Sequence, residues 1–341
     1  MTARKTYPPA MKAVFLEKPG GPLIVKETAI PDPASGEVIV KIAAAPVNPS
    51  DILRIRNAPN NYDLSNFIPG LEGSGRVVAA GKGLLPHLWL GKRVSCSSKY
   101  PSSGTWAEYM VTSADNCFPL NRKVSDEQGS MSLVNPLTAL AFFEIVRKNG
   151  HKAIINNAAA SALGRMVELL GRKARVPVIN IVRNQRQVDT LKGLGSVYIL
   201  NSTDPAFIDN LGSLSEKLEA TLLFDSVCSR QLQQIIEVLP RRSSVIIYGN
   251  LSGEEHIMIN PRSLIDKDAH ISGFYLGNRA KENGLIKNMM NLLKVGRLMS
   301  SDLKINIQGR FPLIRAQEAL DTYLKNMSAG KVLLIPGAQS G

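Results

Sequence analysis

The apolar residues between Met11 and about Leu133 come in short runs that are typical of β-strands. These runs are β-branched or alternate with polar residues, and Gly and Pro separate them. The clearest are VIVKIAAA, SGRVVAAG, GKRVSCSS and TWAEYMVTS. Because long helical periodicity is missing here, the pattern predicts a mostly β domain, built as a partly open barrel.

The pattern changes near Asn135. The segment NPLTALAFFEIVRKNG predicts a helix that Asn135 caps, that holds Pro136 in its first turn and that ends at Gly150. After it, near-continuous apolar strands alternate with amphipathic helices. The predicted strands are HKAIINN, PVINIV, VYIL, ATLLFDSV and SSVIIYGNL, and the predicted helices are SALGRMVELLGRKA, NQRQVDTLKGLG and SRQLQQIIEVLP. This alternation predicts a parallel sheet that helices cover on both faces.

The chain closes with two further helices and a strand. RAKENGLIKNMMNLLKVGRL and IRAQEALDTYLKNM have helical periodicity, and GKVLLIP reads as a strand. We therefore predict an α/β protein of three segments. They are a β-barrel domain at 1–134, a doubly wound parallel-sheet domain at 135–275, and a segment at 276–341 that returns to complete the first domain.

One turn has the form of a dinucleotide site but is poor in glycine. In IINNAAASALGRMVELLG a strand runs into a helix through a turn with one glycine, where three are expected. Backbone N–H groups and the helix N-terminus would meet a pyrophosphate there, with alanine and serine serving where φ stays negative. Gly164 keeps the packing position, and we expect Ser161 to cap the helix and to be able to contact phosphate. The candidate cofactor residues are Asn157, Ala160, Ser161, Ala162, Leu163 and Gly164. A purely structural turn explains the motif equally well.

The end of the next strand, VINIVRNQRQ, favours NADPH as the cofactor. An acidic residue normally stands at this strand end to hold the ribose 2′-OH of NAD. Here no Asp or Glu follows the strand until Asp189. Arg183 and Arg186 stand there instead, and two guanidiniums suit a 2′-phosphate through charge-assisted bonds. The alternative is a solvated basic helix start.

Composition indicates a soluble globular protein. Of the 341 residues, 44% are hydrophobic and 20% are charged, which is enough for two domains with cores. No apolar run approaches the length of a membrane helix, and the N-terminus has no secretory h-region. The three cysteines form no CxxC pair, and the four histidines have no metal-ligand spacing. We therefore expect a reduced, cytoplasmic chain.

The formal net charge of +13 leaves three classes of anionic partner to compare. Nucleic acid would need a dense basic stripe, but the densest runs are RKAR at 172–175 and PRR at 240–242. A membrane surface would need a basic amphipathic helix, and none is obvious. A small anionic molecule needs only a few placed cations, so we expect no nucleic-acid or membrane partner.

An ordered set of motifs resembles the medium-chain dehydrogenase/reductase superfamily. The motifs are AAPVNPSDILRIR, PGLEGSGRVV, GTWAEYMV, VNPLTA, FDSV, YGN and GKVLL, and they extend from about Met11 to Pro336. VNPSDI, NIVRN and LIDKDAHISGFYL lean toward the NADPH-dependent 2-enoyl thioester reductases, whereas YGNLSG and AGKVLLIP suit these or the quinone oxidoreductases. The resemblance implies a GroES-like β-barrel domain, a Rossmann domain and often a homodimer.

Within this superfamily, the resemblance implies a zinc-independent branch. Zinc-binding relatives carry a Cys where this chain has Asn48, a His where it has Leu71, and a third ligand near Val134. Leucine and valine cannot bind a metal, and a structural zinc needs a four-Cys lobe. The segment from Ser95 to Ser103 has one Cys. We therefore expect no metal site.

Without a Lewis acid, hydride transfer to a quinone or to a C=C conjugated to a carbonyl is favoured over alcohol oxidation. The protein must position the reactants, offer donors to the carbonyl oxygen and bring a proton to the α carbon. The candidates are Asn48, as a donor to substrate or cofactor, and Tyr62, as a donor or proton source. Thr138 resembles the threonine beside the nicotinamide. Their structural alternatives are a turn cap, a surface tyrosine and an ordinary helix residue.

Further candidates border the cofactor. Tyr248, Gly249 and Asn250 end a predicted strand, and Lys331 either contacts a phosphate or is solvated. Glu72 is best interpreted as a structural carboxylate. The alternative function is a non-catalytic, cofactor-binding regulatory or structural protein, which the depleted glycine turn and the lack of an acid–base histidine near a motif support.

Overall fold

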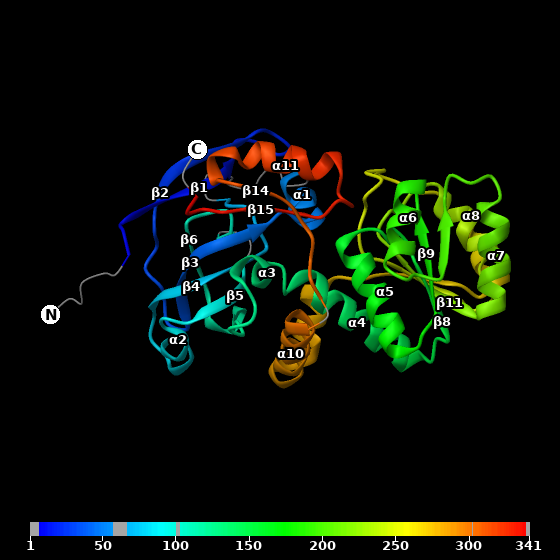
Figure 1. The fold of residues 1–341 in the computed structure, drawn as a ribbon, viewed down its shortest axis with the longest axis horizontal. Helices are drawn as coiled ribbons and strands as arrows, with labels where there is room; N and C mark the ends of the chain where they lie inside the picture. Colours follow the sequence, from blue (N-terminus) through cyan, green and yellow to red (C-terminus); the bar gives the residue numbers. More distant parts are fainter. Residues whose placement is uncertain (1–6, 57–66, 100–102, 302, 339–341) are drawn as a thin grey trace. The chain divides into compact units, whose positions relative to one another are not determined.

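The computed structural model describes residues 7–56, 67–99, 103–301 and 303–338 (Figure 1). The chain divides into two compact units, one formed by Met1–Val134 with Met289–Gly341, the other by Asn135–Asn288. The chain therefore leaves the first unit directly before Asn135 and re-enters it at Met289, inside a helix, rather than at residue 276.

The first unit is built on a seven-stranded sheet and a separate pair of strands. The sheet has the order β14-β15-β3-β4-β5-β7, with β6 paired to β3, and β1 pairs with β2. The strands are β1 Ala10–Leu16, β2 Leu23–Ala29, β3 Glu37–Pro46, β4 Glu72–Ala80, β5 Arg93–Ser97, β6 Tyr109–Ser113, β7 Cys117–Pro119, β14 Ile307–Phe311 and β15 Lys331–Leu334. Because β15 pairs antiparallel with β3, the C-terminal strand completes this unit.

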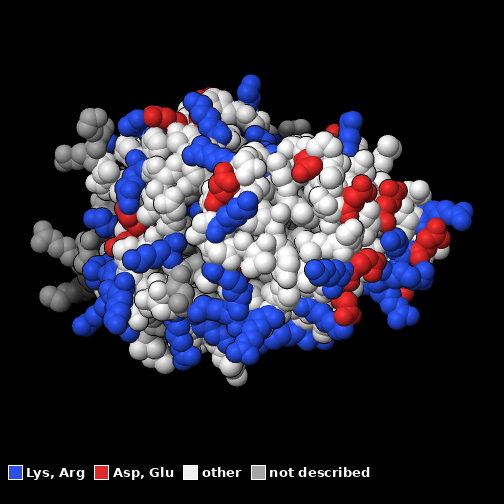
Figure 2. Space-filling view, turned by 45° about the vertical axis from the view of Figure 1, so that its right-hand side comes forward, with Lys and Arg blue, Asp and Glu red and all other residues white. Residues whose placement is uncertain are grey.

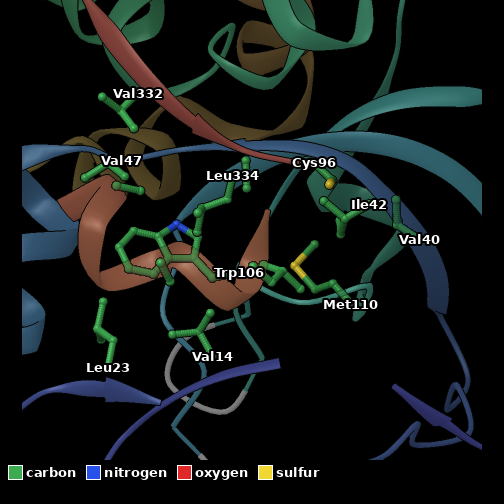
Figure 3. Close-up of a cluster of buried hydrophobic side chains, with 14 of the residues drawn as sticks. Val14, Leu23, Val40, Ile42, Val47, Cys96, Trp106, Met110, Val332 and Leu334 are labelled. Carbon is green, nitrogen blue, oxygen red and sulfur yellow. The ribbon is translucent and has the colours of Figure 1, made fainter. Parts of the chain in front are cut away.

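Short helices cover the first unit, and a tryptophan lies at its centre. The helices are α1 Pro49–Arg56, α2 Leu84–Trp89, α3 Asp126–Ser130 and α11 Ala316–Lys325. Figure 3 shows the indole of Trp106 among Val14, Val47 and Leu334. Trp106 is fully buried, and its N–H donates to the Pro46 carbonyl oxygen at 3.2 Å. The core therefore gains the burial of a large side chain without leaving a polar group unpaired.

The second unit is a six-stranded sheet of order β10-β9-β8-β11-β12-β13, in which every neighbouring pair is parallel. The strands are β8 Ala153–Asn156, β9 Val178–Val182, β10 Tyr198–Asn201, β11 Ala220–Asp225, β12 Ser244–Ile247 and β13 His270–Gly273. The strand order reverses between β8 and β11, which creates a switch point at their carboxyl ends. Ligands of doubly wound sheets bind at such a point.

Helices lie around this sheet in Figure 1, among them α5 Ala162–Ala174, α6 Gln185–Gly193, α7 Phe207–Leu218 and α8 Gln231–Val238. Further helices are α4 Val134–Asn149, α9 Pro261–Lys267 and α10 Leu276–Ser301, and α10 runs from this unit into the first. The sequence pattern did not predict α7 or α9. In the described part of the chain, no helix combines the length and apolarity that a membrane crossing needs.

The start of α4 corrects one prediction. The helix begins at Val134, so Asn135 lies inside it and is not its cap. The Glu72 carboxylate takes the capping role, because its Oε2 accepts the N–H groups of Leu133 at 3.0 Å and Val134 at 2.9 Å. A side chain distant in sequence thus satisfies donors that helix geometry leaves free.

Candidate cofactor turn and buried polar cluster

The turn after β8 is tied to the neighbouring strand across the switch point. The Asn157 side chain donates to Asp225 Oδ1 at 2.8 Å, and its own oxygen accepts the N–H of Ala158 at 2.8 Å. Asp225 ends β11, is 1% exposed and also accepts the N–H of Val227 at 2.9 Å. Burial raises the pKa of Asp225, although the hydrogen bonds that it accepts act to lower this pKa. Sequence reasoning used FDSV only as a family motif and did not identify Asp225 as part of the turn.

Ala158 has a backbone conformation that the sequence did not predict. Its φ is 54°, so the expectation that alanine serves only where φ stays negative is wrong at this position. The conformation costs an alanine about 1 kcal/mol. It is held because the Asn157 bridge precedes it and Ala159 donates its N–H to the Ile181 carbonyl at 3.1 Å. The backbone therefore changes direction at this turn without a glycine.

The turn ends in a capped helix. Ser161 Oγ accepts the N–H of Gly164 at 3.0 Å, which confirms the predicted cap of α5. A Cβ at Gly164 would lie 2.5 Å from the Ala159 carbonyl oxygen, so only glycine fits this close approach. The side chains of Ala160 and Leu163 are buried, which leaves backbone groups to face a ligand.

A cation that the sequence analysis missed lies at the same turn. The Arg165 guanidinium donates through Nε to the Ala160 carbonyl oxygen at 3.0 Å. Burial lowers the pKa of Arg165, and a guanidinium stays protonated in proteins. Because the first N–H groups of a helix and its dipole also favour negative charge, the turn has the electrostatics of an anion site.

The two arginines predicted for the adenosine end lie at the adjacent strand end. Arg183 directly follows β9, and Arg186 lies in the first turn of α6; both side chains are exposed. Strands β8 and β9 pair in parallel, so their carboxyl ends meet at the same edge of the sheet. The turn and the two guanidiniums are therefore at one edge.

Tyr248, Gly249 and Asn250 follow β12 at this edge. Tyr248 donates its N–H to the Asp225 carbonyl at 2.9 Å, and its ring meets Phe142 edge-on at 5.0 Å. Burial raises the pKa of Tyr248 to about 12. The Asn250 side chain donates to the Glu254 carbonyl at 2.8 Å, so it holds its own loop.

The first unit contains a buried polar cluster around Asn48. Asn48 and Lys331 are each 1% exposed and Glu72 is 0% exposed. The Lys331 ammonium donates to Asn48 Oδ1 and, at 3.4 Å, to the Val47 carbonyl oxygen. Asn48 Nδ2 donates in turn to Glu72 Oε1 at 3.1 Å. Both ends of the Asn48 amide are therefore engaged, and Lys331 is not a solvated side chain.

The three positions that bind zinc in zinc-dependent relatives converge on two carboxylates. Asp51 accepts the N–H of Asn48 and the N–H of Leu71, each at 2.9 Å. Glu72 accepts from the Asn48 side chain and from the Val134 N–H. Among the described residues, no group of three or more His, Cys, Asp and Glu side chains is arranged to hold a metal ion.

Burial shifts the pKa values of all three ionisable groups of the cluster. It raises the pKa of Asp51 to about 7 and also raises that of Glu72. It lowers the pKa of Lys331 to about 8, although both carboxylates pull in the opposite direction. The cluster is thus a compensated set of buried charges, and removal of one member leaves the others unbalanced.

Two of the three predicted catalytic residues belong to the described structure. Asn48 lies in the buried cluster, and Thr138 lies in α4 with 6% of its surface exposed. Tyr62 lies outside the described residues.

Comparisons with known proteins agree with this architecture. Residues 34–122 match the alcohol dehydrogenase GroES-like domain, and residues 162–293 match the zinc-binding dehydrogenase domain. The chain is 30% identical over 311 residues to the mitochondrial enoyl-[acyl-carrier-protein] reductase of Arabidopsis thaliana, covering 85% of this chain and 80% of that protein. It is 22% identical over 330 residues to the quinone oxidoreductase of Rattus norvegicus, covering 95% and 98%.

A solved structure extends the likeness to three dimensions. A Mesorhizobium loti protein described as a candidate NADPH:quinone reductase has a TM-score of 0.88 and 30% identity, over 97% of this chain and 100% of that one. The GroES-like unit and the parallel sheet with its switch point define a two-domain oxidoreductase of the dinucleotide-binding type. The chain belongs to the medium-chain dehydrogenase/reductase superfamily, in the branch that includes enoyl reductases and quinone oxidoreductases. The predicted fold class and the resemblance are confirmed.

Proposed function

We propose that the protein is a zinc-independent, NADPH-dependent reductase. It transfers hydride to a C=C conjugated to a carbonyl, in an enone or a 2-enoyl thioester, or to a quinone. The observation that carries the proposal is the pair of exposed guanidiniums, Arg183 and Arg186, at the sheet edge beside the β8 turn. The names of the relatives, enoyl reductase and quinone oxidoreductase, support the substrate classes.

The residues at this edge fit a nicotinamide dinucleotide. The turn at 157–164 offers backbone N–H groups, a helix N-terminus and a neighbouring guanidinium to a pyrophosphate. Arg183 and Arg186 would hold a 2′-phosphate by charge-assisted bonds. Figure 2 shows Lys and Arg in several clusters on the visible face, with fewer Asp and Glu side chains among them and other residues forming most of the surface between. This distribution and the net charge of +13 attract anionic ligands in general.

When bound, NADPH supplies the hydride, and the protein supplies hydrogen bonds and a proton. We assign the donor to the carbonyl oxygen, and the source of the α-carbon proton, to Tyr62, and a position beside the nicotinamide to Thr138. Because both ends of the Asn48 amide are engaged within the first unit, the contacts support a positioning role for Asn48.

The proton-donor role of Tyr62 is tested by Tyr62→Phe, which removes the hydroxyl and keeps the ring. We expect turnover of an enone or enoyl thioester to fall ~10-fold or more, the low end for loss of a positioned acid. Quinone turnover should change less, because the hydroquinone makes smaller demands on the protein. Equal kinetics of the two proteins on the thioester would remove Tyr62 from the mechanism.

A homodimer belongs to the same proposal. Strand β13 ends the sheet order, its outer edge pairs with no described strand, and most of its residues are exposed. Met258 and Ile265, on the segment before it, are 88% and 75% exposed. An open strand edge beside exposed apolar residues favours pairing with a second copy through a two-fold axis. Light scattering after size exclusion measures the mass directly, and a monomer at micromolar concentration would contradict the proposal.

Two experiments test the proposed reductase and its alternative. Fluorescence titration compares NADPH with NADH, and we expect NADPH to bind more tightly. Loss of absorbance at 340 nm is then followed with a benzoquinone and a 2-enoyl thioester of coenzyme A. Binding of NADPH without turnover of any acceptor would favour the non-catalytic cofactor-binding protein.

The cytoplasmic location stays a prediction, because several of the curated relatives are mitochondrial.

A further inference from the structure

Lys331 is a buried cation in a place where a phosphate contact was expected. It begins β15, is 1% exposed, and directs its ammonium at Asn48 Oδ1 and the Val47 carbonyl. A buried ammonium is costly unless charges and hydrogen bonds compensate it. The compensation comes from the carboxylates of Asp51 and Glu72, which both act on Lys331 electrostatically.

The hydrogen bonds of Lys331 continue toward the start of α4. The ammonium holds the oxygen of Asn48, the Asn48 nitrogen holds Glu72, and the other Glu72 oxygen accepts the N–H groups of Leu133 and Val134. Thr138 lies in the same helix, about one turn beyond Val134. The contacts thus form an unbroken series from the C-terminal strand to the helix that carries Thr138.

Other charged or titratable groups surround this series. Arg54, on α1, acts on Asp51, and the Tyr323 ring, on α11, lies 5.7 Å from Lys331 Nζ. A tyrosine ring face stabilises a cation. Lys331 therefore contacts or faces groups from the link between β3 and α1, from α1, from β4 and from α11, so its ammonium is held on several sides.

We propose that Lys331 is a positioning residue, whose ammonium orders Asn48 and Glu72 and thereby fixes the first turn of α4, the helix that carries Thr138. The ammonium acts as a single buried cation among the positions that ligate a metal in zinc-binding relatives. The proposal rests on the proposed function only in that Thr138 is assigned a place beside the nicotinamide. It differs from a phosphate contact, in which Lys331 would act on cofactor affinity.

The test compares Lys331→Met, which keeps most of the side-chain volume, with Lys331→Arg, which keeps the charge. The matched control is Lys152→Met, because Lys152 makes an exposed pair with Glu219. For Lys331→Met we expect kcat at saturating NADPH to fall about 10- to 100-fold, as for a misplaced reacting group. We expect the Kd for NADPH to change less than about 3-fold, and Lys331→Arg to recover part of kcat.

A second readout does not depend on turnover. Hydrogen exchange in peptides that cover residues 131–139 reports the N–H groups that Glu72 accepts, and Lys331→Met should raise their exchange rate. Where Lys331→Met does not fold, the double variant Lys331→Met/Glu72→Gln removes the uncompensated carboxylate, and its exchange is compared with that of Glu72→Gln alone. If the wild-type protein turns over none of the acceptors, the proposed function is wrong. The exchange measurement would still test the inference about Lys331.

Two outcomes would overturn the inference. A Kd for NADPH that rises ~10-fold or more with unchanged kcat would assign Lys331 to a phosphate contact. If Lys331→Met changes neither kcat nor the exchange rates at residues 131–139, Lys331 has no influence on α4.

Discussion

The β8 turn and the polar cluster depart from glycine-rich, zinc-binding relatives in different ways. At the turn, alanine stands where glycine is usual, and Ala158 takes a φ of 54° to preserve the backbone path. At the cluster, metal-ligand positions hold Asn48, Leu71 and Val134, and these now bond to the buried carboxylates of Asp51 and Glu72. A site made of main-chain groups tolerates changed side chains, whereas a site made of side chains must be refilled by groups that balance one another's charge.

The strongest test of this comparison removes a charge from the refilled cluster. Glu72→Leu should lower the free energy of unfolding by about 3–5 kcal/mol, because it removes one of the two carboxylates that compensate Lys331 and also removes the cap of α4. Urea denaturation measures the change. The control Glu216→Leu alters an exposed carboxylate and should have little effect. A cost below about 1 kcal/mol for Glu72→Leu would mean that the cluster is not a balanced set of charges.

The second test concerns Arg183 and Arg186, at the sheet edge beside the β8 turn. Arg183→Ala/Arg186→Ala should weaken NADPH about 100-fold, since two charge-assisted contacts to the 2′-phosphate are lost. Binding of NADH should change little, because NADH lacks that phosphate. Fluorescence titration measures both ligands, and Arg241→Ala/Arg262→Ala, which removes two exposed arginines of the same unit, controls for net charge. An equal loss for NADPH and NADH would show that the arginines act only through the general positive field.

The cluster should also respond to pH. Burial raises the pKa of Asp51 from 3.8 to about 7, so between these values the folded state holds a proton that the unfolded state has released. The contribution of Asp51 to stability therefore falls as pH rises through this window. Asp51→Asn should lessen that fall between pH 5 and pH 7.5, measured by denaturant midpoints. Asp209→Asn, at an exposed carboxylate, serves as the control. The same pH slope in wild type and Asp51→Asn would contradict the raised pKa.

The smallest effect is expected in the turn. Ala158→Gly should raise the free energy of unfolding by about 0.5 kcal/mol, because relief of the positive φ slightly exceeds the entropy that glycine adds to the unfolded chain. Ala160→Gly, in the same turn and without a positive φ, should destabilise by about 0.5–1 kcal/mol. If both substitutions destabilise equally, the backbone at Ala158 carries no strain.

Local patterns predicted much of the second unit, for physical reasons. Buried parallel strands give continuous apolar runs, and Ser161 stands where a helix cap is needed, so the sheet and the α5 cap follow from short stretches of sequence. The missed helix α7 has helical spacing in Phe207, Leu211 and Leu218, which pack on the core, so its pattern was present in the sequence and was overlooked. The conformation of Ala158 was not predicted, because it depends on the Asn157 bridge to Asp225.

The polar cluster could not be predicted in the same way. Asn48, Glu72 and Lys331 come from three separate segments, and no local periodicity links them. A lysine in a polar-looking sequence reads as solvated, and only the pairing of β15 with β3 brings Lys331 into the interior. The sequence did indicate that the metal-ligand positions had changed, but not what would compensate for the loss.

The return of β15 also has a consequence for the order in which the protein is made. Asn48 meets Lys331 across 283 residues, so the first unit cannot close until nearly the whole polypeptide has left the ribosome. The second unit is continuous in sequence and can fold earlier in synthesis. A nascent chain paused before Lys331 would expose an unclosed sheet and a carboxylate pair without its cation, and would depend on chaperones until the last strand arrives.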